Sequence, residues 1–493
     1  MKFNYKVTIH CLLLFSILFL TSGCKKFLDV PLPTDKFAAD GAYISDNSAA
    51  AVVTGIISTA ASAPVYGSAN SYESIAFRSS LYVDDLTPIQ LATVNNAAAV
   101  HSAFYLDAIS SANSTQWPTL YKQIYNCNLV IEGVTKNKDN LSKANQWLGE
   151  ALFLRAFSFF DLVNLYGDVP LTLTSSYVAN NVLGRTSKDV VYKQIIEDLK
   201  LAESYLGTSY LDGIGKVTVN RARPNQYVVN ALLARVYLYT GDWANAEAQA
   251  TKVIGNTTNF QLVAPSLAFL ANSSETIWAL APPTVTAVRD YFIYNGGAPA
   301  SAATQAALAV FTPAAMSQSL LDAFEPNDAR FTNWVRSSTT IAAPAGGTFY
   351  FPAKYKSAVN GTEFNIILRL GEQYLIRSEA RARQNNVSGA VQDLNAIRLR
   401  ARPATPIGAL PDYSPTISQL DCINAIMKER RTELFSESGH RFYDLKRTGV
   451  IDEVMTTVAL NKGTTWASWK QIWPIPAIDP IVNPNLTQAP NYQ

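Results

Sequence analysis

The chain has 493 residues, which is enough for two or three domains or for one large array of packed elements. Charged residues make up 16 % of it, below the roughly 25 % of typical soluble domains, and the formal net charge is +2. This balance offers no basis for nucleic-acid binding or for an acidic tail. Asn, Ser, Thr, Gln and Tyr replace the missing charge, which suits an extracellular surface that presents hydroxyl and amide groups.

The first 23 residues have the pattern of a secretory signal peptide. A basic start precedes an apolar run at 11–20, and small residues at 21–23 lead to Cys24. The run is too short to span a bilayer, and no later run approaches the ~20 residues that a span needs. The pattern predicts a lipoprotein that is cleaved before Cys24 and lipidated on its thiol; the alternative is an ordinary signal peptide with a chance cysteine. An irregular leader is expected at 24–45.

Helical periodicity begins at about residue 46. The sequence predicts helices at 48–62, 117–134, 145–166 and 190–206, followed by helical pairs at 225–254 and 370–400. The helix at 145–166 is apolar on most faces, which indicates burial, and it should stop at Gly167.

The two helical pairs fit the offsets of a tetratricopeptide repeat, in which small residues let two helices approach closely. The first pair matches at Ala234, Tyr237, Gly241, Trp243, Ala246 and Ala250, and the second at Tyr374, Ser378, Ala390, Leu394 and Ile397. Turns are expected at Gly241-Asp242 and at Asn385-Asn386. The pairs lie far apart, so the pattern predicts a repeat-like helical scaffold and not a tandem array.

Between the pairs, residues 256–365 are rich in Pro, Gly, Thr, Ser and Ala, and helical periodicity fades. A short strand is expected at 274–280. Long irregular segments inside a helical protein are usually functional or disordered, and the aromatic content here argues against disorder.

Two cysteines remain after export. Cys127 and Cys422 both lie in apolar helical contexts, so we expect buried free thiols, with a disulfide as the alternative. No CxxC or Cys/His spacing suggests zinc.

The most charge-dense segment runs from residue 429 to 447. Glu429, Glu433 or Glu437 could serve acid–base catalysis, or the segment could form a structural network of Arg–carboxylate pairs that joins helices. We expect the network, because each carboxylate has an arginine within about one turn and such pairing keeps carboxylates ionised. Glu437 and Arg441, at i and i+4, would face each other on a helix.

This segment and three others contain distinctive motifs. Their residues are Glu429-Arg430-Arg431, Glu433-Leu434, Glu437, Arg441-Phe442, Asp444-Leu445 and Arg447; Trp473-Pro474-Ile475-Pro476, Asn483-Pro484-Asn485-Leu486-Thr487-Gln488 and Pro490-Asn491-Tyr492; Glu150-Ala151, Arg155-Ala156, Phe160, Leu162 and Tyr166-Gly167-Asp168-Val169-Pro170-Leu171; and Cys24-Lys25-Lys26-Phe27-Leu28-Asp29. These four segments resemble the SusD/RagB family of outer-membrane, nutrient-binding lipoproteins.

The resemblance implies a mainly α-helical fold with four tetratricopeptide-like helix pairs, a few short strands and a loop-rich ligand face. It implies one domain at 46–493, with helical parts at 46–255 and 366–493 around the loop-rich region at 256–365. It also implies a lipid anchor in the outer membrane, exposure at the cell surface, no cofactor, and a TonB-dependent transporter of the SusC type as partner. The usual cargo is an oligosaccharide, though some relatives take peptides.

A glycan site needs flat apolar side chains for the C–H faces of sugar rings and polar groups for their hydroxyls. Ligand residues vary within this family, so candidates come from composition and place. The aromatic candidates are Tyr72, Phe77, Tyr82, Tyr291, Phe292, Tyr294 and Trp334, and the polar ones are Asn70, Arg78, Asp84 and Asn295.

We therefore predict a non-catalytic capture protein, and two alternatives stay open. A lipid-anchored glycoside hydrolase needs only two carboxylates at a set distance. However, the chain lacks GxSxG, HExxH and P-loop motifs, and only His101 and His440 remain after signal removal. A scaffold that binds another protein is the third interpretation.

Overall fold

The structure is a computed structural model, which describes residues 39–66, 71–89, 100, 103–106, 115–281, 288–296, 314–342 and 347–492. The expected signal peptide at 1–23, the lipidation site Cys24 and most of the expected leader lie outside the described residues.

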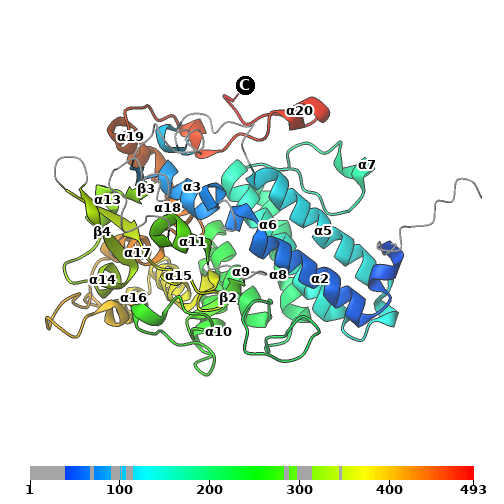
Figure 1. Ribbon diagram of the computed structural model, residues 1–493, viewed down its shortest axis with the longest axis horizontal. Helices are drawn as coiled ribbons and strands as arrows, with labels where there is room; N and C mark the ends of the chain where they lie inside the picture. The colour runs from blue at the N-terminus through cyan, green and yellow to red at the C-terminus, as the bar shows by residue number, and fades with distance from the viewer. Residues whose placement is uncertain are drawn as a thin grey trace, which may run out of the picture.

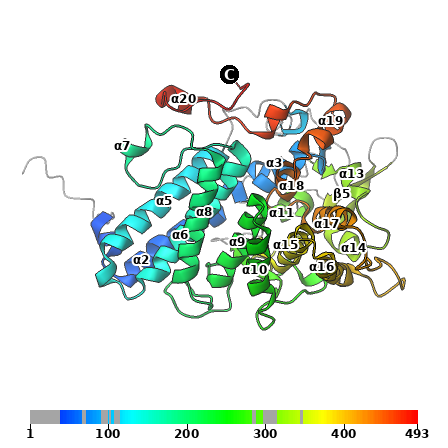
Figure 2. The same cartoon turned by 180° about the vertical axis from the view of Figure 1, so that it is seen from behind.

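Long helices form a continuous row through the molecule, and each packs against the one before it. In chain order they are α2 (Asp46–Ser62), α5 (Gln116–Lys136), α6 (Ala144–Tyr166), α8 (Lys188–Tyr205), α9 (Gln226–Thr240), α10 (Trp243–Ile254), α15 (Leu370–Arg383), α16 (Val387–Ala401) and α17 (Gln419–Leu434). In Figure 1 the row runs from α2 and α5 on the right to α16 and α17 on the left, and Figure 2 shows the same order from behind. The expected mainly α fold with repeat-like helical pairs is confirmed.

The expected turns within both pairs are also confirmed. Gly241, with a φ of 75°, ends α9, and Asp242 caps α10 by accepting the Asn245 N–H at 3.2 Å. Asn385 has a φ of 65°, and Asn386 caps α16. Side chains with local hydrogen-bonding capacity therefore set both reversals.

Shorter helices lie around this row. They are α3 (Ile75–Tyr82), α7 (Tyr177–Asn180), α11 (Arg289–Tyr291), α13 (Gln318–Leu321), α14 (Ala329–Trp334), α18 (His440–Arg447), α19 (Ile451–Asn461) and α20 (Ile478–Val482). Among the described residues, no helix has both the length and the apolar character that crossing a membrane requires.

The described strands pair into three two-stranded antiparallel sheets. They are β1 (Leu86–Pro88) with β3 (Ala314–Met316), β2 (Thr276–Leu280) with β6 (Asn365–Arg369), and β4 (Val335–Ala342) with β5 (Thr348–Pro352). The strand expected at 274–280 is thus confirmed as β2. Its pairing with β6 brings the two ends of the loop-rich region together.

Helix α6 is the centre of the largest core, and every residue of it from Trp147 to Tyr166 is buried, as the apolar pattern predicts. A second core gathers Phe77, Tyr294, Trp334 and Phe435, and a third lies among α15, α16 and α17. Cys127 and Cys422 are buried and free, which confirms that expectation.

Both ends of the described chain pack onto the same helices. Tyr43 closes the 3₁₀ helix η2 (Ala39–Tyr43), and its ring lies on Gly133 of α5, where a Cβ would overlap it. From the C-terminal segment, Trp473 N donates to Leu165 O at 2.9 Å, and Asp479 Oδ2 accepts from Trp117 Nε1 at 2.6 Å. The last residues of the expected leader therefore belong to the folded body.

Candidate functional site

The charged C-terminal motif forms a buried network of ion pairs. Glu429 and Glu433 project from α17 toward arginines that are distant in sequence. Arg330 Nη1 lies 2.6 Å from Glu429 Oε1 and 3.0 Å from Glu433 Oε2, and Arg369 and Arg400 also pair with Glu433. These arginine side chains are at most 4 % exposed. The network therefore joins α17 to α14, β6 and α16.

Cationic partners keep Glu433 and Glu437 ionised. Burial alone would raise the pKa of Glu433, but Arg400 and its two other arginine partners hold that pKa well below its usual range. The pKa of Glu437 is likewise lowered by Arg369 and Lys354 against the effect of burial. The expected structural network is confirmed. Glu429, Glu433 and Glu437 take their partners from other elements, whereas Asp444 pairs with Arg447 of the neighbouring turn at 2.7 Å.

The expected pairing of Glu437 with Arg441 on one helix is wrong. The chain turns sharply between α17 and α18, at residues 435–439, where three residues have a positive φ. Glu437 Oε2 accepts from Arg369 Nε at 2.8 Å, whereas Arg441 Nε donates to Asp84 Oδ1 at 2.9 Å. The break in the helix sends the two side chains to different partners.

A groove of about 520 Å³ lies where β1, the start of α13, α18 and α19 meet. Its lining combines apolar side chains, such as Leu86, Val454 and Val458, with charged ones that include Arg431 and Arg441. This volume falls within the range of sites that bind small molecules.

The charges in the groove have partners within the protein. Arg431 and Arg441 both pair with Asp84, at 2.9 Å, and against the effect of burial they hold the pKa of Asp84 well below its usual range. Lys462 Nζ donates to two backbone oxygens at the end of α3, at 2.6 and 3.0 Å, and burial lowers its pKa to about 7. The groove thus offers apolar contact and hydrogen-bonding groups that are held in place by partners within the protein.

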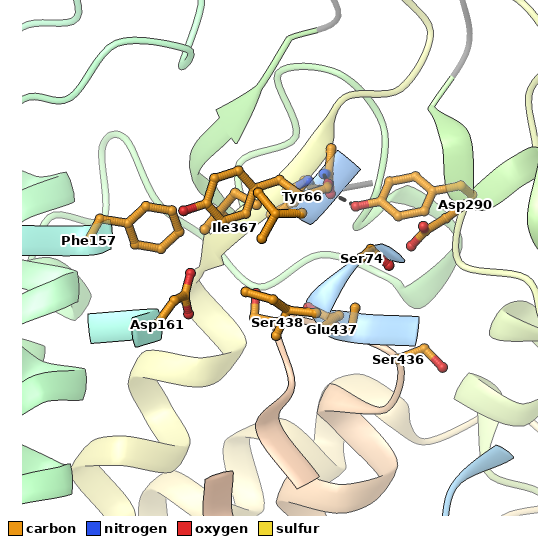
Figure 3. A pocket seen from close by; sticks show the side chains of 15 residues that line it. Tyr66, Ser74, Phe157, Asp161, Asp290, Ile367, Ser436, Glu437 and Ser438 are labelled. Atoms are coloured by element: carbon orange, nitrogen blue, oxygen red, sulfur yellow. Dashed lines mark hydrogen bonds between the residues drawn. The ribbon is translucent and has the colours of Figure 1, made fainter. Parts of the chain in front are cut away.

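A smaller pocket of about 40 Å³ lies beside α6 (Figure 3). Phe157 and Asp161 line one side of it in this view, and Asp290 and Ser436 line the other. Burial raises the pKa of Asp161 to about 7, and burial with the nearby charge of Glu437 does the same for Asp290. The volume suits a few water molecules and not a sugar ring.

Several residues proposed from the sequence as ligand contacts lie in the core. Phe77, Tyr82, Tyr294, Trp334 and Arg78 are each at most 3 % exposed. Phe77 packs 6.2 Å from Tyr294, and Arg78 pairs with Glu73 at 2.5 Å. Tyr82 packs against Phe442 and Trp473, and the guanidinium of Arg78 also lies over the Trp473 ring. In this conformation these rings present almost no surface to a ligand.

The remaining candidates lie nearer the surface. Tyr72 and Tyr291 are partly buried and pack at the edge of the core that holds Phe77 and Tyr294, and Phe292 lies 5.2 Å from Tyr291. Asp84 is buried but lines the groove. Asn70 lies outside the described residues, and the Asn295 side chain also lies outside them.

Sequence reasoning assigned no site role to Lys462, Arg431 or Ser319, which the structure brings to the groove with Asp84. The one available signal was the adjacent acids Asp84 and Asp85, because two neighbouring carboxylates that become buried need cationic partners. The sequence does not show which cations those are, since they lie more than 340 residues away.

Models of two related families match the chain. Residues 36–238 match a SusD-like model described as starch-binding and associating with the outer membrane, and residues 348–492 match the SusD family. SusD-like protein P25 of Formosa agariphila is 24 % identical over 96 % of both chains. SusD-like protein P2 of the same organism is 27 % identical over 76 % of this chain and 79 % of its own.

Solved structures show the same fold. A SusD superfamily protein from Bacteroides vulgatus aligns with a TM-score of 0.73 at 21 % identity, covering 91 % of this chain and 99 % of its own. A laminarin-binding SusD-like protein aligns with a TM-score of 0.72 at 22 % identity, covering 90 % and 99 %. The chain therefore belongs to the SusD family of glycan-binding proteins that associate with the outer membrane.

Proposed function

We propose that this protein captures nutrient oligosaccharides without cleaving them and delivers them to a TonB-dependent transporter of the SusC type. The observation that carries the proposal is a groove of ligand size, lined by charges that are already paired, in a chain of the SusD family. Fixed donors and apolar side chains suit a polyhydroxylated ligand, and binding alone needs no perturbed acid.

The proposal includes a lipid anchor at Cys24 and display at the cell surface. The support is the sequence pattern of residues 1–24 together with the family's association with the outer membrane. An oligosaccharide is the favoured cargo because one structural neighbour is a laminarin-binding protein. A peptide is the alternative cargo within the same family.

A glycoside hydrolase remains the rival function, and one feature bears on it. Asp290 and Glu437 line the small pocket, and their environments shift their pKa values in opposite directions, as an acid and its partner carboxylate would require. A space of about 40 Å³ does not admit a sugar ring between them. Release of sugar from any bound glycan, lost in Glu437→Gln, would establish the hydrolase and overturn capture without cleavage.

For ligand contact we propose Asp84 in the groove and three aromatic residues that are not part of its lining, Tyr72, Tyr291 and Phe292, with Asn70 and Asn295 as further polar partners. The three aromatic residues retain some exposed surface, whereas the other aromatic candidates are buried.

We expect Tyr72→Ala and Tyr291→Ala each to weaken glycan binding about 3- to 10-fold, because each removes a ring face worth roughly 0.5–1.5 kcal/mol. Calorimetry of the chain from Lys25 against laminarin, other glycans and peptides measures this. Tyr125→Ala, on the exposed surface of α5, is the matched control and should leave affinity unchanged. Unchanged affinity in both site variants, with the fold intact, would remove this choice of residues.

A further inference from the structure

Six large apolar side chains stand exposed at one corner of the molecule. They belong to α7, to the turn after it and to α20, which lie at the same corner in both views (Figures 1 and 2). Each is between 56 % and 78 % exposed, and together we call them the apolar corner: Tyr177, Val178, Val182, Ile478, Ile481 and Val482. Single exposed apolar residues are ordinary, but a contiguous group marks an interaction site.

Hydrogen bonds join the two segments into one surface. Asn483 Nδ2 donates to Leu183 O at 2.8 Å, and Asn485 Nδ2 donates to Val182 O at 2.9 Å. The corner is therefore built from two parts of the chain that meet only in the folded protein.

Each short helix is also fixed to the body beneath it. Trp117 of α5 donates its indole N–H to Asp479 of α20. Asn128 of α5 donates to Thr172 O and Thr174 O, just before α7, at 3.0 Å each. Polar contacts thus hold the backbone in place while the apolar side chains point away from the core.

The few charged residues in the two segments of the apolar corner favour a protein partner over an anionic lipid surface. Segments 176–186 and 477–488 contain one cation and one anion, Arg185 and Asp479. Arg185 Nε donates to Thr487 O at 2.8 Å, and Asp479 is held by Trp117. A surface for anionic lipid would need clustered Lys or Arg, whereas an apolar centre with an amide rim is typical of a protein interface.

The corner also lies near the point where the chain enters the fold. Tyr43 packs on Gly133 of α5, and the neighbouring Glu132 Oε1 accepts from Ser175 N at 2.7 Å, next to α7. The 15 residues from 24 to 38 can span at most about 50 Å. A lipid on Cys24 would therefore keep this side of the molecule close to the membrane.

We propose that the apolar corner is the surface through which this protein docks on its transporter, where it covers an uncharged apolar patch of that membrane protein. The proposal rests on the delivery function proposed above and adds to it the residues that make the contact.

The test uses the full-length tagged lipoprotein, purified in detergent from its native outer membrane, with the SusC-type transporter identified and quantified by mass spectrometry. We expect Val178→Asp with Ile481→Asp to lower the co-purified transporter at least about tenfold, because a charge is forced into an apolar contact. Ile407→Asp with Leu420→Asp, also strongly exposed but located around the start of α17, is the matched control and should retain the transporter. The melting temperature and glycan affinity of both variants should match wild type.

Other results separate the two proposals. A corner variant that retains the transporter overturns the corner alone. A wild-type lipoprotein that binds glycan but never carries a SusC-type transporter overturns delivery, and the corner with it. If the unlipidated chain binds phosphatidylethanolamine–phosphatidylglycerol vesicles, or forms dimers in sedimentation, and the corner variant does neither, the occupant is the membrane or a second copy and the proposal is wrong.

Discussion

Glu433 pairs with three arginines while it is fully buried. Each arginine comes from a different element, so one carboxylate holds three separate parts of the chain to α17. In a low-dielectric interior such a pair adds little net stability over apolar packing, but the loss of one partner leaves the others with an uncompensated charge. Single substitutions in this network should therefore be severe.

We expect Glu433→Gln to lower the free energy of unfolding by about 3–5 kcal/mol, because Arg330, Arg369 and Arg400 would lose their shared anion. Asp412→Asn makes the same chemical change at a pair with Arg402 that is largely exposed, and it should cost at most about 1 kcal/mol. Urea denaturation compares the two. Equal and small effects would mean that the arginines find other partners.

The pH dependence of stability should carry a signature of Asp161. Burial raises its pKa to about 7, while an unfolded Asp titrates near 3.9, so the folded state holds the extra proton between about pH 4 and 7. Protonated Asp161 therefore contributes its full stabilisation of the folded state below about pH 4, and this contribution is lost as the pH rises toward 7.

The Asp161→Asn variant has no carboxyl group at this position, so it does not take up this proton. The free energy of unfolding should therefore decline less with rising pH than in wild type, by up to about 1.4 kcal/mol per pH unit. Denaturation curves at pH 5, 6 and 7 measure the difference. Wild-type and variant slopes that run parallel would show that Asp161 is already ionised across this range.

At the scale of the elements, a glycine in α5 lets the 3₁₀ helix η2 pack closely against it. Gly133 and Gly55 are both helical, but Gly133 faces the ring of Tyr43, whereas a Cβ on Gly55 would meet nothing within 4 Å. The same substitution therefore has opposite expected signs at the two positions.

Gly55→Ala should stabilise the protein by about 1 kcal/mol through helix propensity. Gly133→Ala gains the same propensity but displaces Tyr43, and overpacking of this kind costs about 1–3 kcal/mol, so we expect a net loss. Thermal denaturation of both variants gives the comparison. A Gly133→Ala protein as stable as Gly55→Ala would show that η2 leaves α5 at little cost.

Across the whole molecule, the sequence predicts the scaffold much better than the site. The long helices from α2 to α16 were predicted because each combines a 3.6-residue apolar period with local capping signals, such as Gly241 at the end of α9 and Asn386 at the start of α16. The sequence predicted a structural network of Arg–carboxylate pairs. It did not predict which residues pair, because Arg330 and Arg369 reach Glu433 only through the tertiary fold.

The candidate site was harder to predict, because the aromatic composition of a loop does not show which rings face inward. Phe77 and Tyr294 come from segments as rich in small and polar residues as those of Tyr72 and Tyr291, yet they form the core on which these others pack. Contacts between segments that are distant in the sequence determine which of these rings are exposed. The local periodicity of a single sequence does not reveal such contacts.

The position of Glu433 near the end of the chain also sets an order of assembly. Arg330, Arg369 and Arg400 all precede it, and an arginine buried without an anion costs several kcal/mol. Asp328 and Glu275 are the earlier carboxylates that lie beside these arginines, and Glu429, Glu433 and Glu437 complete the set only at the end of the chain. A chain that ends before α17 would lack these three carboxylates, so we expect its arginines to keep their contact with water and this part of the fold to stay open.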